Sequence, residues 1–108
     1  MNNTDYTSLL NNKLLKERSR LLILCFLLGS ETNSATFMVL QKALNLSRGN
    51  LSVQIKMLNE ADYLSIDKSF KNNKPQTMVT ITNEGIKSLR GYLKEMEMII
   101  TSTYDAKE

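Results

Sequence analysis

The N-terminal part of the chain shows a helical pattern of apolar residues. Leucines recur at helical spacing between residues 9 and 15, and residues 21–28 form an almost uninterrupted apolar run that ends at Gly29. A helix that is apolar nearly all round is normally buried, and glycine is common at helix ends. The pattern therefore predicts one long helix or two abutting helices over residues 8–29, with the second half in the core.

Two shorter helices are predicted next, close together in the sequence. Ser34 can cap a helix over residues 34–44, and Ser47 can cap another over residues 48–61. The second helix has a narrow apolar stripe at the spacing i, i+4, i+7, formed by Leu51, Ile55 and Leu58. Two short helices separated by a break of about three residues are typical of a helix-turn-helix.

The spacing of apolar residues then changes from helical to alternating, which predicts two strands. They cover residues 64–70 and 76–82 and flank a polar turn at residues 71–75, which carries lysines at both sides. Strand, basic turn and strand together predict a β-hairpin that projects as a wing.

The last predicted helix covers residues 83–103 and follows Thr82. Gly85 is expected to be tolerated in its first turn, whereas Gly91 costs the helix about 1 kcal/mol relative to alanine, so that packing must hold it. Its apolar positions alternate steps of three and four, as in the seam of a coiled coil. They are Ile86, Leu89, Leu93, Met96 and Ile100, with Tyr92 and Ile99 beside them.

These elements predict one domain over residues 1–108 with a mainly α fold and a small β-hairpin (α+β). The core and the wing occupy residues 8–82, and a C-terminal dimerisation helix occupies residues 83–103. The expected architecture is a winged helix-turn-helix.

The distribution of charge is more informative than its sum. The net charge is only +3, from 14 basic and 11 acidic residues. The predicted recognition helix and wing, residues 45–82, hold five basic residues against the three acidic residues Glu60, Asp62 and Asp67. From residue 83 onward acidic residues outnumber basic ones. The positive excess therefore lies in the first three-quarters of the chain, which include the predicted recognition helix and wing.

Several classes of chemistry are disfavoured by the composition. The chain has no histidine and a single cysteine, Cys25, which excludes ordinary zinc sites and histidine-based triads. The four glycines are scattered and form no phosphate-binding loop. We therefore expect no enzyme, no cofactor and no metal site. The apolar run around Cys25 is too short to cross a membrane, and a single cysteine cannot form a disulfide within the chain, so we expect a cytosolic protein. Because nothing near Cys25 would lower its pKa, we expect its thiol to be buried and unreactive.

The outward face of the second short helix carries residues that can read base edges. Arginine can bind guanine, asparagine and glutamine can bind adenine, and an apolar group can meet the thymine methyl. Lysines of the wing can neutralise phosphates. The candidate DNA-binding residues are Arg48, Gly49, Asn50, Ser52, Val53, Gln54, Lys56, Lys68, Lys71, Asn72, Asn73 and Lys74.

The last helix is expected to pair with a second copy of the chain. Its later apolar residues, Met96 to Ile100, lie beyond the part of the helix that a domain of this size can cover, so they would form an apolar patch on the surface. A contiguous apolar patch on a soluble protein commonly marks an interface. The candidate interface residues are Leu9, Leu10, Leu14, Leu89, Tyr92, Leu93, Met96, Ile99 and Ile100. The alternative is a monomer in which the N-terminal helix of the same chain covers the stripe.

From about Arg18 to Ile100 the sequence resembles small winged-helix regulators of the MarR/ArsR-like superfamily. The segment LNLSRGNLSVQIKMLNEADYLSIDKSF is similar to their recognition helix and first wing strand, and TMVTITNEGIKSLRGYL to their second strand and dimerisation helix. Asp62 stands where such proteins commonly carry glycine, and we expect a left-handed conformation there. The resemblance implies a DNA-binding repressor or activator with a two-fold symmetric operator. It does not imply metal sensing, because the cysteine and histidine ligands are missing.

Two functions from different classes are compatible with this pattern. The leading hypothesis is a homodimeric regulator that binds specific sequences in double-stranded DNA. The alternative, which the modest net charge leaves open, is a winged-helix module that binds proteins and not DNA. A steep dependence of DNA affinity on salt distinguishes them, because only binding to DNA releases condensed counterions.

Overall fold

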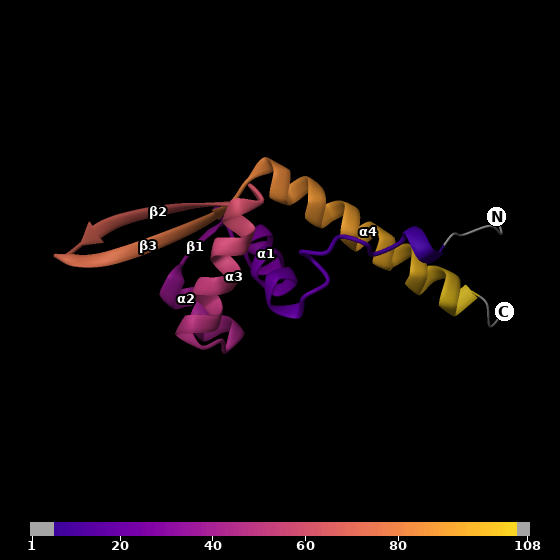
Figure 1. Cartoon of the computed structure of the whole chain (residues 1–108), viewed down its shortest axis with the longest axis horizontal. Helices are drawn as coiled ribbons and strands as arrows, with labels where there is room; N and C mark the ends of the chain where they lie inside the picture. Colours follow the sequence, from indigo (N-terminus) through magenta and orange to yellow (C-terminus); the bar gives the residue numbers. More distant parts are fainter. Residues whose placement is uncertain (1–5, 106–108) are drawn as a thin grey trace.

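A short 3-10 helix, three short α-helices, a three-stranded sheet and one long α-helix make up the part of the chain that the computed structural model describes, residues 6–105 (Figure 1). The ends of the predicted 1–108 domain lie outside these residues. The elements in chain order are η1 (Tyr6–Ser8), α1 (Arg18–Gly29), β1 (Ser34–Thr36), α2 (Phe37–Leu44), α3 (Arg48–Glu60), β2 (Leu64–Lys71), β3 (Lys74–Ile81) and α4 (Asn83–Asp105). The predicted α+β winged helix-turn-helix is confirmed.

The prediction of a helix over residues 8–29 is wrong in its first half. A short 3-10 helix is followed by turns, and α1 begins only at Arg18. The side-chain oxygen of Asn12 accepts hydrogen bonds from the backbone N–H groups of Leu14 (2.9 Å) and Leu15 (3.1 Å). Asparagine side chains compete with helical hydrogen bonds in this way. The leucine spacing therefore came from a folded loop that inserts Leu15 fully into the core.

The prediction that Ser34 caps the second helix is also wrong, by two residues. Ser34 begins the short strand β1, and Thr36 caps α2 by accepting from the backbone N–H of Val39 at 3.1 Å. Ser34 instead lies opposite Thr80 of β3, where the two hydroxyl oxygens are 2.7 Å apart. Serine can cap a helix or pair in a sheet, and here the pairing with Thr80 places Ser34 in a strand.

The three strands form an antiparallel sheet in the order β1-β3-β2. The register of the hairpin pairs Leu64 with Ile81 at its base and Lys71 with Lys74 at its tip. The connection is the two-residue turn Asn72–Asn73, in which both φ angles are positive (53° and 65°), as the favoured hairpin turns require. The predicted hairpin is confirmed, with strands that extend further into the tip than expected.

The core lies between α1, α2, α3, the base of the sheet and the first half of α4. Its fully buried side chains come from every one of these elements: Leu15, Ile23, Leu24, Leu27, Leu40, Leu51, Leu58, Leu64, Val79 and Leu89. The wing and the second half of α4 extend from this core in opposite directions, so the molecule measures 60 × 25 × 24 Å (Figure 1). Within residues 6–105 no helix is long and apolar enough to span a bilayer.

The junction between the sheet and α4 depends on Asp62, Thr82 and Gly85. Asp62 has a φ of 64°, which confirms the left-handed conformation expected there. The Thr82 hydroxyl donates to the carbonyl of Asp62 (2.6 Å) and accepts from the backbone N–H of Gly85 (3.0 Å). A Cβ at Gly85 would collide with the carbonyl oxygen of Tyr63. The close approach of α4 to this turn therefore requires glycine at position 85, rather than merely tolerating it.

Candidate nucleic-acid interface

The turn between α2 and α3 sets the direction of the recognition helix. Asn45 adopts a left-handed conformation (φ 52°) at the end of α2, and the backbone N–H of Leu46 donates to the carbonyl of Gln41 at 3.2 Å. Ser47 caps α3 as predicted, because its hydroxyl accepts from the backbone N–H of Asn50 at 3.1 Å. The helix-turn-helix is thereby fixed by local hydrogen bonds that the sequence itself specifies.

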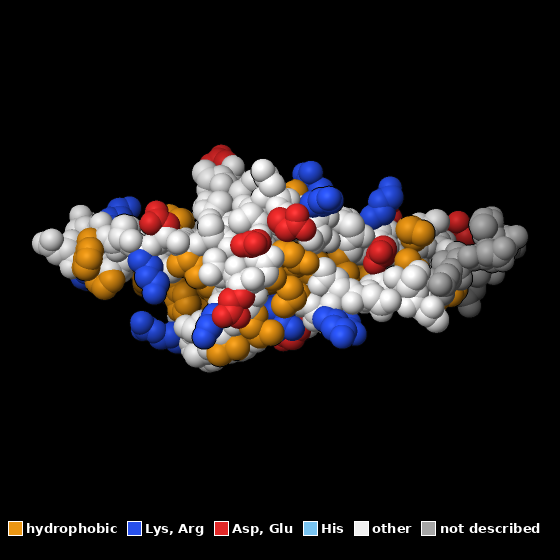
Figure 2. Space-filling view, turned by 45° about the horizontal axis from the view of Figure 1, so that its top comes forward, with side chains coloured by type: hydrophobic (Ala, Val, Ile, Leu, Met, Phe, Trp, Pro, Cys, Tyr) orange, Lys and Arg blue, Asp and Glu red, His pale blue; other side chains and the backbone are white. Residues whose placement is uncertain are grey.

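A groove of about 890 Å³ runs between α2, α3 and the wing. All five basic residues of the segment 45–82 line it, namely Arg48, Lys56, Lys68, Lys71 and Lys74. None of the residues that line the groove within the described part of the chain is acidic. Basic side chains are visible along the wing side of the molecule, beside a cluster of hydrophobic ones (Figure 2). The groove is thus lined by positive charge.

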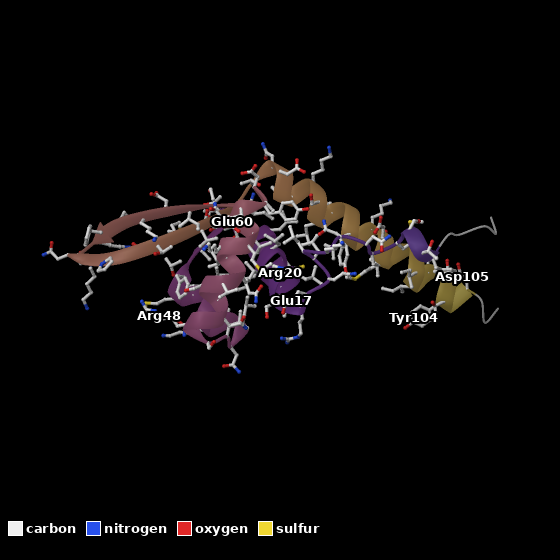
Figure 3. The ribbon with its side chains drawn as sticks, viewed as in Figure 1. Glu17, Arg20, Arg48, Glu60, Tyr104 and Asp105 are labelled. Atoms are coloured by element: carbon white, nitrogen blue, oxygen red, sulfur yellow. The ribbon has the colours of Figure 1, made fainter. Side chains whose placement is uncertain are left out.

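All of the predicted DNA-binding residues except Gln54 divide into two sets around this groove. Those that line it are Arg48, Ser52, Lys56, Lys68, Lys71, Asn72 and Lys74. Those that are exposed outside it are Gly49, Asn50, Val53 and Asn73. Figure 3 shows Arg48 at the start of α3 and Glu60 at its other end, away from the basic tip of the wing. The helix therefore offers two exposed flanks, one toward the wing and one away from it.

Gln54 does not project outward, and this part of the prediction is wrong. Its side chain is 8% exposed and its Oε1 accepts a hydrogen bond of 2.6 Å from Nη1 of Arg20 in α1. Its Nε2 donates to Oδ1 of Asn50 at 2.9 Å. A helical wheel placed Gln54 on the flank of α3, but α1 packs against that flank and covers it. Gln54 therefore cannot read a base directly.

Arg20 is a residue that sequence analysis missed. It lies between α1 and α3, is 9% exposed, and donates through Nε to the carbonyl of Leu14 at 2.8 Å (Figure 3). Nη1 also contacts the sulfur of Met57 at 3.3 Å. A buried arginine needs such partners, since an unpaired buried charge is costly. Its position in the charged stretch KERSR gave the appearance of a surface residue.

The groove also contains residues that the sequence gave no reason to choose. Thr36 and Met38 at the start of α2 line it, as do Ile55 and Ile66 on its floor. Met38 is largely exposed although it is apolar. An exposed methionine in a short amphipathic helix looks like a core residue in the sequence, so no signal there could have identified it.

The predicted interface residues of α4 are not all available to a partner. Leu89 and Tyr92 are buried in the chain's own core, so their placement in an interface is wrong. Met96 and Ile99 are half-buried, whereas Leu93 and Ile100 are exposed. Leu9, Leu10 and Leu14 are half-buried in the N-terminal loop, and the backbone N–H of Leu10 donates to Oε1 of Glu95 in α4 at 2.8 Å.

The thiol of Cys25 is half-buried on α1, and burial raises its pKa. A raised pKa leaves less of the nucleophilic thiolate, as expected for an unreactive cysteine. Within residues 6–105 there is no cluster of acidic and cysteine side chains that could hold a metal ion.

A helix-turn-helix, a basic recognition helix and a wing on one groove define the winged-helix class of DNA-binding domains. The chain belongs to the winged helix DNA-binding domain family, whose model matches residues 19–100. It is 34% identical over 77 residues to an uncharacterized protein of Methanocaldococcus jannaschii, an alignment that covers 71% of this chain and 82% of that protein.

The structure is also similar to solved transcriptional regulators. The transcriptional regulator homologue from Pyrococcus horikoshii OT3 has a TM-score of 0.82 and 28% identity, with 91% of this chain and 95% of that chain covered. A MarR family transcriptional regulator from Streptomyces coelicolor, solved in complex with DNA, has a TM-score of 0.69 and 18% identity, with 89% and 62% covered. The fold is thus that of the small MarR-like winged-helix proteins.

Proposed function

We propose that this protein is a transcription regulator that binds specific sequences in double-stranded DNA as a homodimer. The observation that carries the proposal is the groove between α3 and the wing, which gathers five basic side chains and no acidic one. Family membership and the resemblance to the Pyrococcus horikoshii regulator homologue support it.

The two sides of the groove have different roles in this proposal. The N-terminal half of α3 enters the major groove, where Arg48 and Asn50 meet base edges. Lys71 and Lys74 at the wing tip, and Lys68 behind them, contact the phosphate backbone that passes between wing and helix. Phosphate contacts supply affinity for any sequence, and base contacts supply the preference among sequences.

The second half of α4 supports the homodimer. It extends beyond the core, with Tyr104 near its end (Figure 3), and Leu93, Ile100 and Tyr104 are exposed at helical spacing. The N-terminal loop lies along α4, held by the Leu10–Glu95 hydrogen bond, yet it leaves these side chains exposed. A two-fold partner helix buries the stripe and places two recognition helices about 34 Å apart, one turn of DNA.

Binding to duplex DNA at several salt concentrations tests the function. The logarithm of affinity should fall linearly with the logarithm of salt, with a slope of about −0.9 for each phosphate neutralised. Lys71→Ala with Lys74→Ala should weaken binding to every sequence and flatten the slope by about two contacts. Lys94→Ala removes an exposed lysine from α4, outside the groove, and should leave the slope unchanged.

Arg48→Ala tests the specific part of the proposal. Loss of a bidentate base contact should reduce the preference for the selected sequence by about 1–3 kcal/mol, while affinity for unrelated DNA changes much less. If the parent protein shows no salt-dependent DNA binding, the function is wrong and a protein-binding module takes its place.

A further inference from the structure

A chain of hydrogen bonds connects the buried face of α1 to the exposed start of α3. Arg20 donates to Gln54, and Gln54 donates to Asn50, at 2.6 Å and 2.9 Å. Arg20 and Gln54 are buried, whereas Asn50 is exposed on the flank of α3 that faces away from the wing. We call these three residues the amide relay.

The chemistry of arginine sets the direction of the amide relay. A guanidinium has only donors, so the atom of Gln54 that meets it must be the carbonyl oxygen Oε1. The amide nitrogen of Gln54 then faces Asn50, and the atom of Asn50 that meets it must be the oxygen Oδ1. As a result, Nδ2 of Asn50 is the group that faces away from the protein interior.

The guanidinium is itself held in place, which makes this direction a stable property of the fold. Its Nε donates to the carbonyl of Leu14, and Nη1 lies 3.3 Å from the sulfur of Met57. The backbone N–H of Arg20 also donates to the Glu17 side chain, which caps α1 (Figure 3). Loop, α1 and α3 therefore converge on one charged group.

We propose that Arg20 and Gln54 are positioning residues that fix Asn50 as a hydrogen-bond donor, so that Asn50 selects a base with an acceptor in the major groove. The inference rests on the proposed DNA-binding function. An unconstrained asparagine can present both its oxygen and its nitrogen, which is the geometry that reads adenine. With Oδ1 engaged by Gln54, Asn50 favours guanine, whose N7 and O6 are both acceptors, over a base that offers a donor at that edge.

Two substitutions change the group that position 50 presents outward, without a change in side-chain size. In Gln54→Glu the new carboxylate has only acceptors, so Asn50 must donate Nδ2 to it and turn Oδ1 outward. In Asn50→Asp the exposed side chain has only acceptors, so it presents an acceptor outward while it still accepts from Gln54. Asn11→Asp, in the exposed N-terminal loop, makes the same change of charge far from the groove.

The experiment selects binding sites from a duplex DNA library with a randomised centre, using the parent and the three variants. In the parent, one position should prefer guanine over adenine and cytosine, which present an amino donor at that edge, by about tenfold. Gln54→Glu and Asn50→Asp should both shift that position to cytosine or adenine, which present amino donors, and leave the other positions unchanged. Asn11→Asp should select the same sequences as the parent. Thermal unfolding followed by circular dichroism verifies that each variant is folded.

The outcomes separate the relay from the DNA-binding function. If a folded Gln54→Glu variant selects the same sequences as the parent, the proposed role of Arg20 and Gln54 is wrong. If Gln54→Glu does not fold, Asn50→Asp decides, since an unchanged preference there excludes Asn50 as a donor to a base. If all variants bind DNA with a dependence on salt, the proposed DNA-binding function stands whether or not the amide relay does. If the parent protein does not bind DNA, the function and the amide relay are both wrong.

Discussion

The two halves of α4 carry the same apolar pattern but lie in different surroundings. In the first half, Leu89 is fully buried against the core, and Gly85 touches the turn that precedes β2. Farther along the same stripe, Met96 is half-buried against the core, whereas Leu93, Ile100 and Tyr104 are 37%, 53% and 72% exposed. The stripe runs on after the core ends, as the extended helix in Figure 1 shows.

This difference shows what a repeating apolar pattern does and does not specify. Steps of three and four predict a helix with one apolar face. They do not say whether that face meets the same chain or another one. In α4 the buried Leu89 contributes to the free energy of folding of the chain itself, and the exposed side chains after it are those that we propose to pair with a second copy.

The largest expected effect comes from deletion of side-chain volume in the buried half. Leu89→Ala should lower the free energy of unfolding by about 2–5 kcal/mol, because it removes buried contacts and leaves a cavity. Leu93→Ala, four residues later, should cost much less. Both are compared by chemical denaturation in an Ile100→Glu background, so that dimerisation does not contribute. Equal losses at the two positions would contradict the division of α4.

A charge in the exposed half should affect association and leave the fold unchanged. Ile100→Glu should raise the dimer dissociation constant by about a hundredfold, because a carboxylate without a partner is costly to bury. Sedimentation at micromolar concentration measures this shift, and circular dichroism should show unchanged helix content. A parent protein that sediments as a monomer, or an Ile100→Glu variant that remains dimeric, would place the interface elsewhere.

The two glycines of α4 provide a smaller and oppositely signed pair of effects. Gly85→Ala should destabilise the protein by about 1–3 kcal/mol, because its Cβ meets the backbone of Tyr63 and the helix must shift. Gly91→Ala should stabilise it by about 1 kcal/mol, since nothing lies within 4 Å of its Cβ position and alanine is the better helix former. Thermal unfolding of the two variants checks the signs, and a gain at position 85 would be incompatible with the observed packing.

Local patterns in the sequence were sufficient for much of the fold. The hydroxyl of Ser47 at the start of α3 and the alternation of apolar residues in the strands act over a few residues, so their consequences could be predicted. The left-handed conformation of Asp62 was instead expected from the resemblance to winged-helix regulators, which commonly carry glycine there. The five basic residues of the groove were also evident, because charge and order along the chain suffice to place them near a helix-turn-helix and its wing.

Other features depended on which element packs against which, and the sequence did not determine them alone. The leucines of residues 9–15 have helical spacing, but Asn12 and the contact with α4 favour a loop. Gln54 was expected on an outward flank of α3, and Arg20 stands in a charged stretch of sequence, but the packing of α1 on α3 buries both side chains.

The sequence thus determined α3, α4, the wing and the charge of the groove, because hydrogen bonds and apolar periodicity over short distances specify them. Only the tertiary structure decided where the core ends along α4 and which way the amide of Asn50 faces. Both depend on contacts between segments that lie far apart in the sequence. Arg20 and Gln54, for example, are 34 residues apart. No local pattern records such contacts, since they arise only when the elements pack.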